Sequence, residues 1–156
     1  MLDHLKSHLI GKLVILGIGN TLRSDDGVGS ILASRIKDRT PFIVFDVGTS
    51  PENYLGKIVK ERPDTVLIID AVDSGAAPGE YNLLENEQLK TANLYFTHNA
   101  SLSLLINYLQ TNLKADIIIL IIQPKTIAFG ENLSLEVNQT LDKLESWFCE
   151  TAKNPG

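Results

Sequence analysis

The sequence predicts a three-layer α/β/α fold, in which helices cover both faces of a twisted, mostly parallel sheet of about five strands with an antiparallel strand at one edge. Three observations favour this class: short β-branched runs alternate with segments of helical period, one run is apolar almost throughout, and polar clusters follow the runs. The 156 residues, of which 44% are hydrophobic, suffice for one domain with a core. We expect a single domain over residues 1–156, with residues 1–11 as a loose N-terminal extension and residues 151–156 as a tail.

The first half of the chain contains three predicted strands and two predicted helices. The strands are short runs rich in apolar and β-branched residues, at residues 12–16, 42–45 and 65–69. Residues 25–38 place apolar side chains on one helical face, and Ser24 or Asp25 suits the N-cap of that helix. A second helix should begin at Ser50 and Pro51, which are typical of an N-cap and a first turn.

The second half adds two strands and two helices. Residues 80–84 alternate polar and apolar side chains, which is typical of a strand at the edge of a sheet. Residues 116–122 contain the most continuous apolar run, so this strand should be central and covered on both faces. Apolar stripes at helical spacing predict helices over residues 101–113 and 134–149.

Charge, apolar runs and cysteine content exclude several classes of protein. The net charge is −5 and no basic stripe is present, so we expect no nucleic-acid partner. The longest apolar run, residues 117–122, is far too short for membrane insertion, and residues 1–11 lack the apolar core of a signal peptide. The one cysteine, Cys149, cannot form an intramolecular disulfide or a cysteine-cluster metal site. A cytoplasmic monomer is the simplest expectation.

Four polar or glycine-rich segments stand at the ends of predicted elements. Three follow strands, at residues 17–29, 46–49 and 70–73, and the fourth, residues 97–99, precedes the helix at 101–113. Ligands of open, mostly parallel α/β sheets bind outside the carboxyl ends of the strands. These segments are therefore where we expect a functional site.

The adjacent acids Asp25 and Asp26 open the predicted helix after the first strand. One acid is enough for a helix cap, so the pair indicates a functional role for at least one of them. Gly27 and Gly29 would let another backbone approach the start of this helix closely.

Two other kinds of site fit the sequence less well. Residues 17–19 form a Gly-x-Gly sequence that invites a nucleotide, but Leu22 stands where the third glycine belongs and the acids that follow would repel a pyrophosphate. A serine or cysteine nucleophile is also disfavoured. Cys149 lies on the apolar side of the last predicted helix, and Ser24 and Ser101 are better explained as helix-start residues.

Three side chains from separate segments are candidate ligands of one metal ion: Asp26 (or Asp25), Asp70 and His98. His98 is the one histidine outside the N-terminal extension, in which we expect His4 and His8 to be surface residues. One nitrogen and two oxygen ligands leave positions open to water or a substrate donor, so the isolated protein should bind a divalent metal weakly. Imidazole favours nickel, copper or zinc, whereas carboxylates alone would favour magnesium or manganese.

Residues 16–29, Leu-Gly-Ile-Gly-Asn-Thr-Leu-Arg-Ser-Asp-Asp-Gly-Val-Gly, resemble the N-terminal signature of the nickel–iron hydrogenase maturation endopeptidases. Further matching segments are residues 46–53, 67–73, 78–80, 97–99 and 122–124. The resemblance extends from about Lys12 to the last predicted helix. The segments at 50–53 and 97–99 are similar to the branch that serves formate-hydrogenlyase-type and related energy-converting hydrogenases.

Membership of this family implies a hydrolase, an aspartyl-type endopeptidase that acts in protein processing. Such enzymes remove a short C-terminal extension from the precursor of a hydrogenase large subunit after nickel has been inserted. The family's catalytic, metal-contacting positions map onto Asp26, Asp70 and His98, while Asp25 becomes the cap. The resemblance also implies that nickel arrives with the precursor and that the isolated protease binds it weakly or not at all.

The resemblance further implies that Asp46, Gly48 and Thr49 take part in substrate recognition. Val47 departs from the family pattern, because it stands where Asp-Gly-Gly-Thr has its first glycine. The main alternative is a non-enzymatic nickel- or nucleotide-binding module of the same fold, which would bind its ligand without proteolysis. A self-sufficient metallohydrolase that acts on small amides is a third interpretation.

Overall fold

The structure of the chain is a computed structural model that describes residues 2–9, 11–85, 95–96 and 99–153. Its strands are β1 (Leu13–Ile18), β2 (Ile43–Gly48), β3 (Thr65–Asp73), β4 (Tyr81–Glu85), β5 (Tyr95–Phe96) and β6 (Asp116–Ile122). The sheet has the order β2-β1-β3-β6-β4, and β5 pairs with β3 outside that order. The pairs β1–β2, β1–β3 and β3–β6 are parallel, whereas β4 and β5 pair antiparallel. The predicted mostly parallel sheet with an antiparallel edge strand is therefore confirmed.

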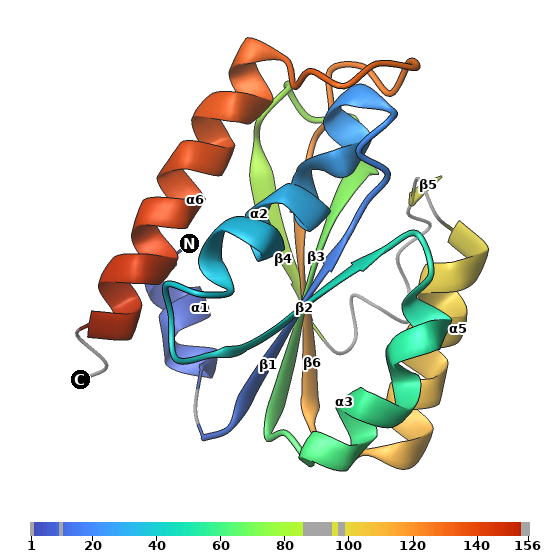
Figure 1. The fold of residues 1–156 in the computed structure, drawn as a ribbon, viewed down its shortest axis with the longest axis vertical. Helices are drawn as coiled ribbons and strands as arrows, with labels where there is room; N and C mark the ends of the chain where they lie inside the picture. The colour runs from blue at the N-terminus through green and yellow to red at the C-terminus, as the bar shows by residue number, and fades with distance from the viewer. Residues whose placement is uncertain (1, 10, 86–94, 97–98, 154–156) are drawn as a thin grey trace.

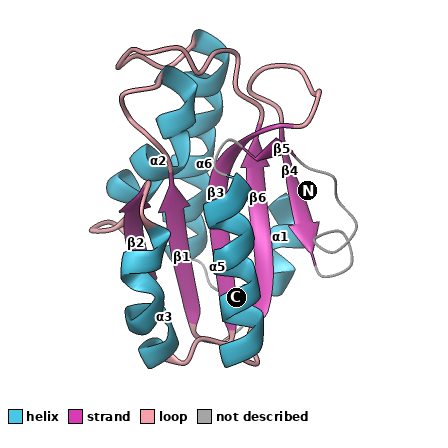
Figure 2. Ribbon diagram, turned by 90° about the vertical axis from the view of Figure 1, so that its right-hand side faces the viewer, coloured by secondary structure: helices cyan, strands magenta, loops and turns pink. Residues whose placement is uncertain are grey.

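Helices cover both faces of this sheet, as the three-layer prediction requires (Figure 1). The helical elements are α1 (Leu2–His8), the 3-10 turn η1 (Ser24–Gly27), α2 (Val28–Ile36), the 3-10 turn η2 (Pro51–Tyr54), α3 (Leu55–Glu61), α5 (Asn99–Asn112) and α6 (Leu135–Lys153). Figure 2 shows α3 and α5 on one face, with α2 and α6 behind the sheet. Of the helices in the described part of the chain, none combines the length and hydropathy that a membrane span requires.

Alternate residues of the central strands point to the two helical layers. In β3, Leu67 and Ile69 pack with residues of α1, α2 and α6, whereas Val72 packs with residues of α3 and α5. Because side chains alternate along a strand, Asp70 shares the face of Val72, and it is fully buried. In β6, every residue from Ile117 to Ile122 is buried, as the continuous apolar run predicted.

The N-terminal segment is not loose, contrary to the sequence prediction. Leu5 of α1 is fully buried in the core, and Leu2 and Leu9 are partly buried against the same cluster. These leucines are spaced by three and four residues and so share one helical face. Polar residues separate them in the sequence, so the stripe is too short to predict a helix. At the other end, α6 continues to Lys153, beyond the predicted end at residue 149.

Two predicted helices begin with a 3-10 turn. η1 precedes α2 and η2 precedes α3. Ser50 is at the N-cap position of η2 and Pro51 is in its first turn, as predicted, although the Ser50 side chain makes no capping bond. The predicted cap of the first helix is wrong, because neither Ser24 nor Asp25 makes a side-chain capping bond there. Both side chains instead bond to segments between 100 and 109 residues further along the chain.

Candidate functional site

The strand order has a switch point at the carboxyl ends of β1 and β3. The chain leaves β1 for β2 on one side, and β3 lies on the other side of β1. Such a switch point is where α/β sheets bind ligands. η1 follows β1 and contacts β3. Asp26 of η1 is 2% exposed and Asp70 of β3 is 0% exposed, so two buried acids lie on contacting elements at this edge.

Glycines let η1 and the start of α2 rest directly on the strand ends. A Cβ atom on Gly29 would lie 2.3 Å from the carbonyl oxygen of Ile18 and equally close to that of Ile69. A Cβ atom on Gly19 would lie 2.4 Å from the carbonyl oxygen of Asp26. These separations are far below van der Waals contact, so a side chain at either position would force the backbones apart. The expected close approach at the helix start is confirmed, and it holds η1 beside β3.

Asp25 anchors a distant loop. Its carboxylate accepts hydrogen bonds from the backbone N–H groups of Lys125, Thr126 and Ser134 at 2.9, 3.3 and 2.7 Å. The Ser134 hydroxyl donates a fourth bond at 2.8 Å. Ser134 directly precedes α6, so Asp25 ties the start of α6 to η1. Asp25 is 0% exposed, and its four bonds give it a structural role different from that of Asp26.

The loop at residues 125–130, which we call the strap loop, runs beside η1. Ser24 has a left-handed backbone with φ 53°, and its N–H donates to the carbonyl of Gly130 at 2.7 Å. The Ser24 hydroxyl donates to the carbonyl of Ala128 at 2.8 Å. The strap loop exposes two apolar side chains, Ile127 at 37% and Phe129 at 87%. An exposed apolar surface beside a buried acid is suited to contact with another protein.

One charged pair closes the base of the strap loop. The Lys125 ammonium lies 3.0 Å from the Glu136 carboxylate in the first turn of α6. A backbone hydrogen bond and then the Lys125 side chain lower the pKa of Glu136 below its usual value. The carboxylate therefore stays ionised at neutral pH and keeps this contact.

The loop after β2 is held by the carboxylate of Asp46. This carboxylate accepts hydrogen bonds from the Ser30 hydroxyl on α2 and from the Gly48 N–H. Gly48 has φ 58°, a left-handed conformation that favours glycine. Val47 is 3% exposed and packs in the core, so valine fits where the family pattern has glycine. Thr49 is exposed at the carboxyl edge, where it is available to a partner.

Gln123 shapes the loop after β3. Its side-chain oxygen accepts a bond from the Ser74 N–H at 2.8 Å, and its amide nitrogen donates to Asp73 at 3.1 Å. Its backbone carbonyl accepts from the Gly79 N–H at 2.8 Å, and its N–H donates to the Glu80 carbonyl at 2.8 Å. The matched segments at 78–80 and 122–124 therefore meet in space. The sequence placed both in the family pattern without predicting this contact.

His98 lies outside the described residues, so its place in the site stays a prediction. One described neighbour in the chain, Phe96, lies at the carboxyl end of β3. Phe96 pairs with Val72, two residues after Asp70, and α5 begins at Asn99. α5 packs on the sheet face to which Asp70 points.

Of the three side chains weighed as nucleophiles, Cys149 and Ser24 have structural roles, and the side chain of Ser101 is outside the described part of the structure. Cys149 is 8% exposed in α6, and the hydroxyl of Ser24 donates to a carbonyl of the strap loop. In the described residues of this edge, the buried carboxylates of Asp26 and Asp70 are thus the groups best suited to metal binding or proton transfer.

A doubly wound sheet with buried acids at its switch point and an apolar loop beside them defines an α/β protein with a candidate site at its carboxyl edge. Comparison with known proteins narrows this class. The family model HycI, hydrogenase maturation protease, matches residues 27–151. The chain therefore belongs to this family of hydrogenase maturation proteases, which are hydrolases.

Individual relatives agree with this assignment. The hydrogenase 3 maturation protease of Escherichia coli K12 is 31% identical over 140 residues, which cover 86% of this chain and 89% of that protein. The crystal structure of the nickel–iron hydrogenase maturation protease HycI from Thermococcus kodakarensis is 31% identical and superposes with a TM-score of 0.85, covering 97% of this chain and 99% of that one. The solution structure of the E. coli endopeptidase HycI is 29% identical with a TM-score of 0.78, and 94% of each chain is covered.

Proposed function

We propose that this protein is an aspartyl-type endopeptidase that removes the C-terminal extension of a nickel-loaded hydrogenase large-subunit precursor. The observation that carries this proposal is the pair of buried acids, Asp26 and Asp70, on contacting elements at the switch point of a maturation-protease fold. The Escherichia coli relative bears the name of hydrogenase 3 maturation protease, which supports a precursor of the formate-hydrogenlyase type.

In this proposal the nickel ion belongs to the precursor, and the protease tests for its presence. Asp26, Asp70 and His98 would supply two oxygen ligands and one nitrogen ligand from three segments of the chain. Such a site has few ligands and open positions, so it suits an ion that the precursor already holds. Nickel binding to the isolated protease would be weak or absent.

Cleavage then needs an activated water molecule. The water oxygen adds to the scissile carbonyl carbon, which is polarised beside the metal, while a carboxylate of the site accepts the water proton. The proton passes to the leaving amine nitrogen as the carbon–nitrogen bond breaks. The structural roles of Cys149 and Ser24 support a direct attack by water over a covalent acyl-enzyme.

Two loops at the same edge are suited to hold the precursor. The loop of Asp46, Gly48 and Thr49 is bonded to the end of β1, where the Gly19 N–H donates to the Gly48 carbonyl, and the strap loop is bonded to Ser24 of η1. We propose that the protease acts as a monomer in the cytoplasm. The single cysteine and the net charge of −5 support a reducing compartment and a protein partner.

The test is the cleavage of a nickel-loaded, unprocessed large subunit, followed by mass spectrometry of the product. The variants Asp26→Asn, Asp70→Asn and His98→Ala should each slow cleavage by on the order of 100-fold or more. Asp38→Asn is the matched control, since Asp38 is exposed in the turn that follows α2. Circular dichroism shows whether each variant is folded. Normal rates in all three folded variants would show that the site is elsewhere.

A further inference from the structure

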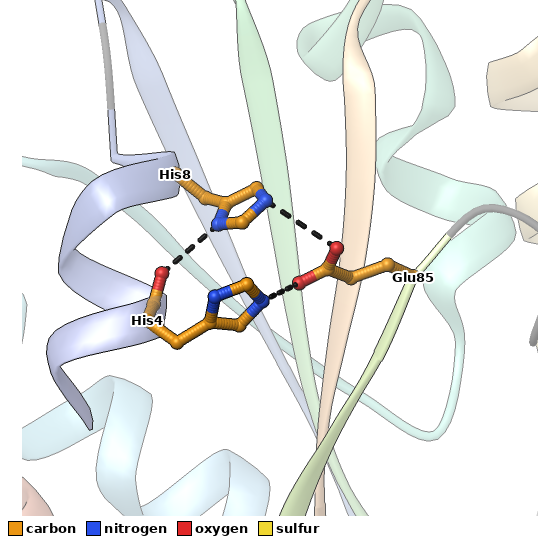
Figure 3. A group of neighbouring side chains, drawn as sticks. All are labelled: His4, His8 and Glu85. Carbon is orange, nitrogen blue, oxygen red and sulfur yellow. Dashed lines mark hydrogen bonds and ion pairs between the residues drawn. The ribbon is translucent and has the colours of Figure 1, made fainter. Parts of the chain in front are cut away.

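We propose that α1 and β4 form a second metal site, in which His4, His8 and Glu85 bind one divalent transition-metal ion such as Zn²⁺ or Ni²⁺. The site is separate from Asp26 and Asp70, and the proposed proteolysis does not depend on it. Its three residues come from the first helix and from the last residue of an edge strand, as Figure 3 shows.

The three side chains converge on one point. His4 and His8 are one helical turn apart on α1 and face the same side. The Nε2 atom of His4 lies 2.8 Å from Oε1 of Glu85, and the Nε2 atom of His8 lies 3.3 Å from Oε2 (Figure 3). One ligand atom from each residue lies within 4.8 Å of the others. Ligands about 2.1 Å from a tetrahedral ion are about 3.4 Å apart, so small side-chain movements would complete the site.

The hydrogen bonds of His8 determine which nitrogen carries its proton. Nδ1 lies 2.9 Å from the backbone oxygen of His4, and a carbonyl oxygen can only accept, so Nδ1 carries the proton. The Ser7 hydroxyl donates to the same carbonyl at 2.6 Å and therefore does not donate to Nδ1. Neutral His8 thus presents its Nε2 lone pair to Glu85. An Nδ1–H bonded to a backbone carbonyl is the arrangement that orients metal-binding histidines.

A lone pair that faces a carboxylate needs a positive charge between them. Either a second proton on the imidazole or a bound cation supplies that charge. A metal ion would bind both imidazoles and the Glu85 carboxylate together. A proton on one imidazole nitrogen joins only that ring to Glu85. Two imidazoles and one carboxylate are a ligand set that favours zinc, nickel or copper over magnesium and calcium.

The rest of the structure keeps this site preformed and open. Leu5, between the two histidines in the sequence, is fully buried and fixes α1 against the core. The side chains of His4, His8 and Glu85 are 59%, 29% and 24% exposed, so an ion and its water ligands can enter. Binding would join α1 to β4 and would stabilise the folded state, since His4 and Glu85 are 81 positions apart in the chain.

The test is isothermal titration of Zn²⁺, and separately Ni²⁺, into the full chain after treatment with EDTA. All titrations use the Asp26→Asn, Asp70→Asn background, so that the proposed precursor site does not contribute. We expect one ion per chain and a rise in Tm with metal concentration. The double variant His4→Ala, His8→Ala should lose this binding, and Glu85→Gln should weaken it by on the order of 10–100-fold. Lys6→Ala on the same helix should leave it unchanged.

Three results would overturn the proposal. The first is a chain that binds neither ion, which would mean that protons alone join the histidines to Glu85. The second is full binding in the double histidine variant. The third is full binding in folded Glu85→Gln, which decides the matter if the histidine variant fails to fold. Cobalt substitution adds a structural check, because Co²⁺ at this site should show the absorption bands of nitrogen and oxygen coordination.

Discussion

The adjacent residues Asp25 and Asp26 show how two identical side chains acquire different surroundings. Both are buried in η1, at 0% and 2% exposure. Asp25 accepts four hydrogen bonds from the strap loop and the start of α6, whereas Asp26 sits beside β3 at the switch point. The sequence indicated that one acid of the pair is structural, but not which segment it holds. A contact across 109 residues, such as that to Ser134, leaves no local pattern.

Replacement of Asp25 by asparagine should lower the stability of the protein more than it lowers the rate of cleavage. The new amide nitrogen cannot accept the bonds that one carboxylate oxygen now accepts, so buried N–H donors would be left without partners. We expect the free energy of unfolding to fall by about 2–4 kcal/mol. Urea denaturation measures this loss, and the exposed Asp38→Asn variant should stay within about 0.5 kcal/mol of wild type. An Asp25→Asn midpoint equal to that of wild type would contradict the anchoring role.

Long elements could be predicted from the sequence, and short ones could not. The apolar run of β6 gave its bounds, residues 116–122, because a strand covered on both faces needs apolar residues throughout. β5 has two residues and forms only through its pairing with β3, so its own sequence carries no strand signal. α1 has only a weak helical signal, because two of its own leucines and Leu9 just after it are the apolar residues of an otherwise polar segment. The 3-10 turns η1 and η2 likewise depend on the elements they contact.

The close packing of α2 against the strand ends requires glycine at position 29, and this can be tested. The Cβ atom of alanine would lie 2.3 Å from two backbone oxygens, which cannot rotate away, so the helix start must move. We expect Gly29→Ala to cost about 3 kcal/mol in unfolding free energy and to slow cleavage by displacing Asp26 from β3. Gly56→Ala in α3 is the matched control. Its Cβ atom would meet nothing within 4 Å, so we expect a gain of about 0.5 kcal/mol.

Thermal or urea unfolding of both glycine variants decides this prediction. If Gly29→Ala is as stable as Gly56→Ala, the start of α2 does not rest on β1 and β3 as described. Cleavage rates of the folded variants then separate an effect on the site from an effect on stability. A loss at Gly29 alone would link the position of η1 to cleavage, because Gly56 faces open space and lies outside the site.

At the scale of the whole molecule, the placement of Asp26 and Asp70 at the carboxyl edge could be predicted, but the contacts that surround them could not. The rule that ligands bind at the carboxyl ends of parallel strands was enough to place Asp26 and Asp70 at one edge. These surrounding contacts join distant segments: the strap loop bonds to η1, Gln123 to the loop after β3, and Ser30 to Asp46. These contacts depend on the folded arrangement. The role of His98 stays a prediction of the family resemblance.

The strap loop gives the whole molecule an apolar contact beside the site, and Phe129 is its most exposed member at 87%. If the precursor docks there, burial of this ring contributes about 1.5–3 kcal/mol to binding. We therefore expect Phe129→Ser to lower kcat/KM for the precursor by about ten-fold or more while leaving the urea midpoint unchanged, because the ring contributes little to the core. Phe129→Leu keeps an apolar group and should retain most of the activity. Equal kcat/KM values for Phe129→Ser and wild type would show that the precursor docks elsewhere on the carboxyl edge.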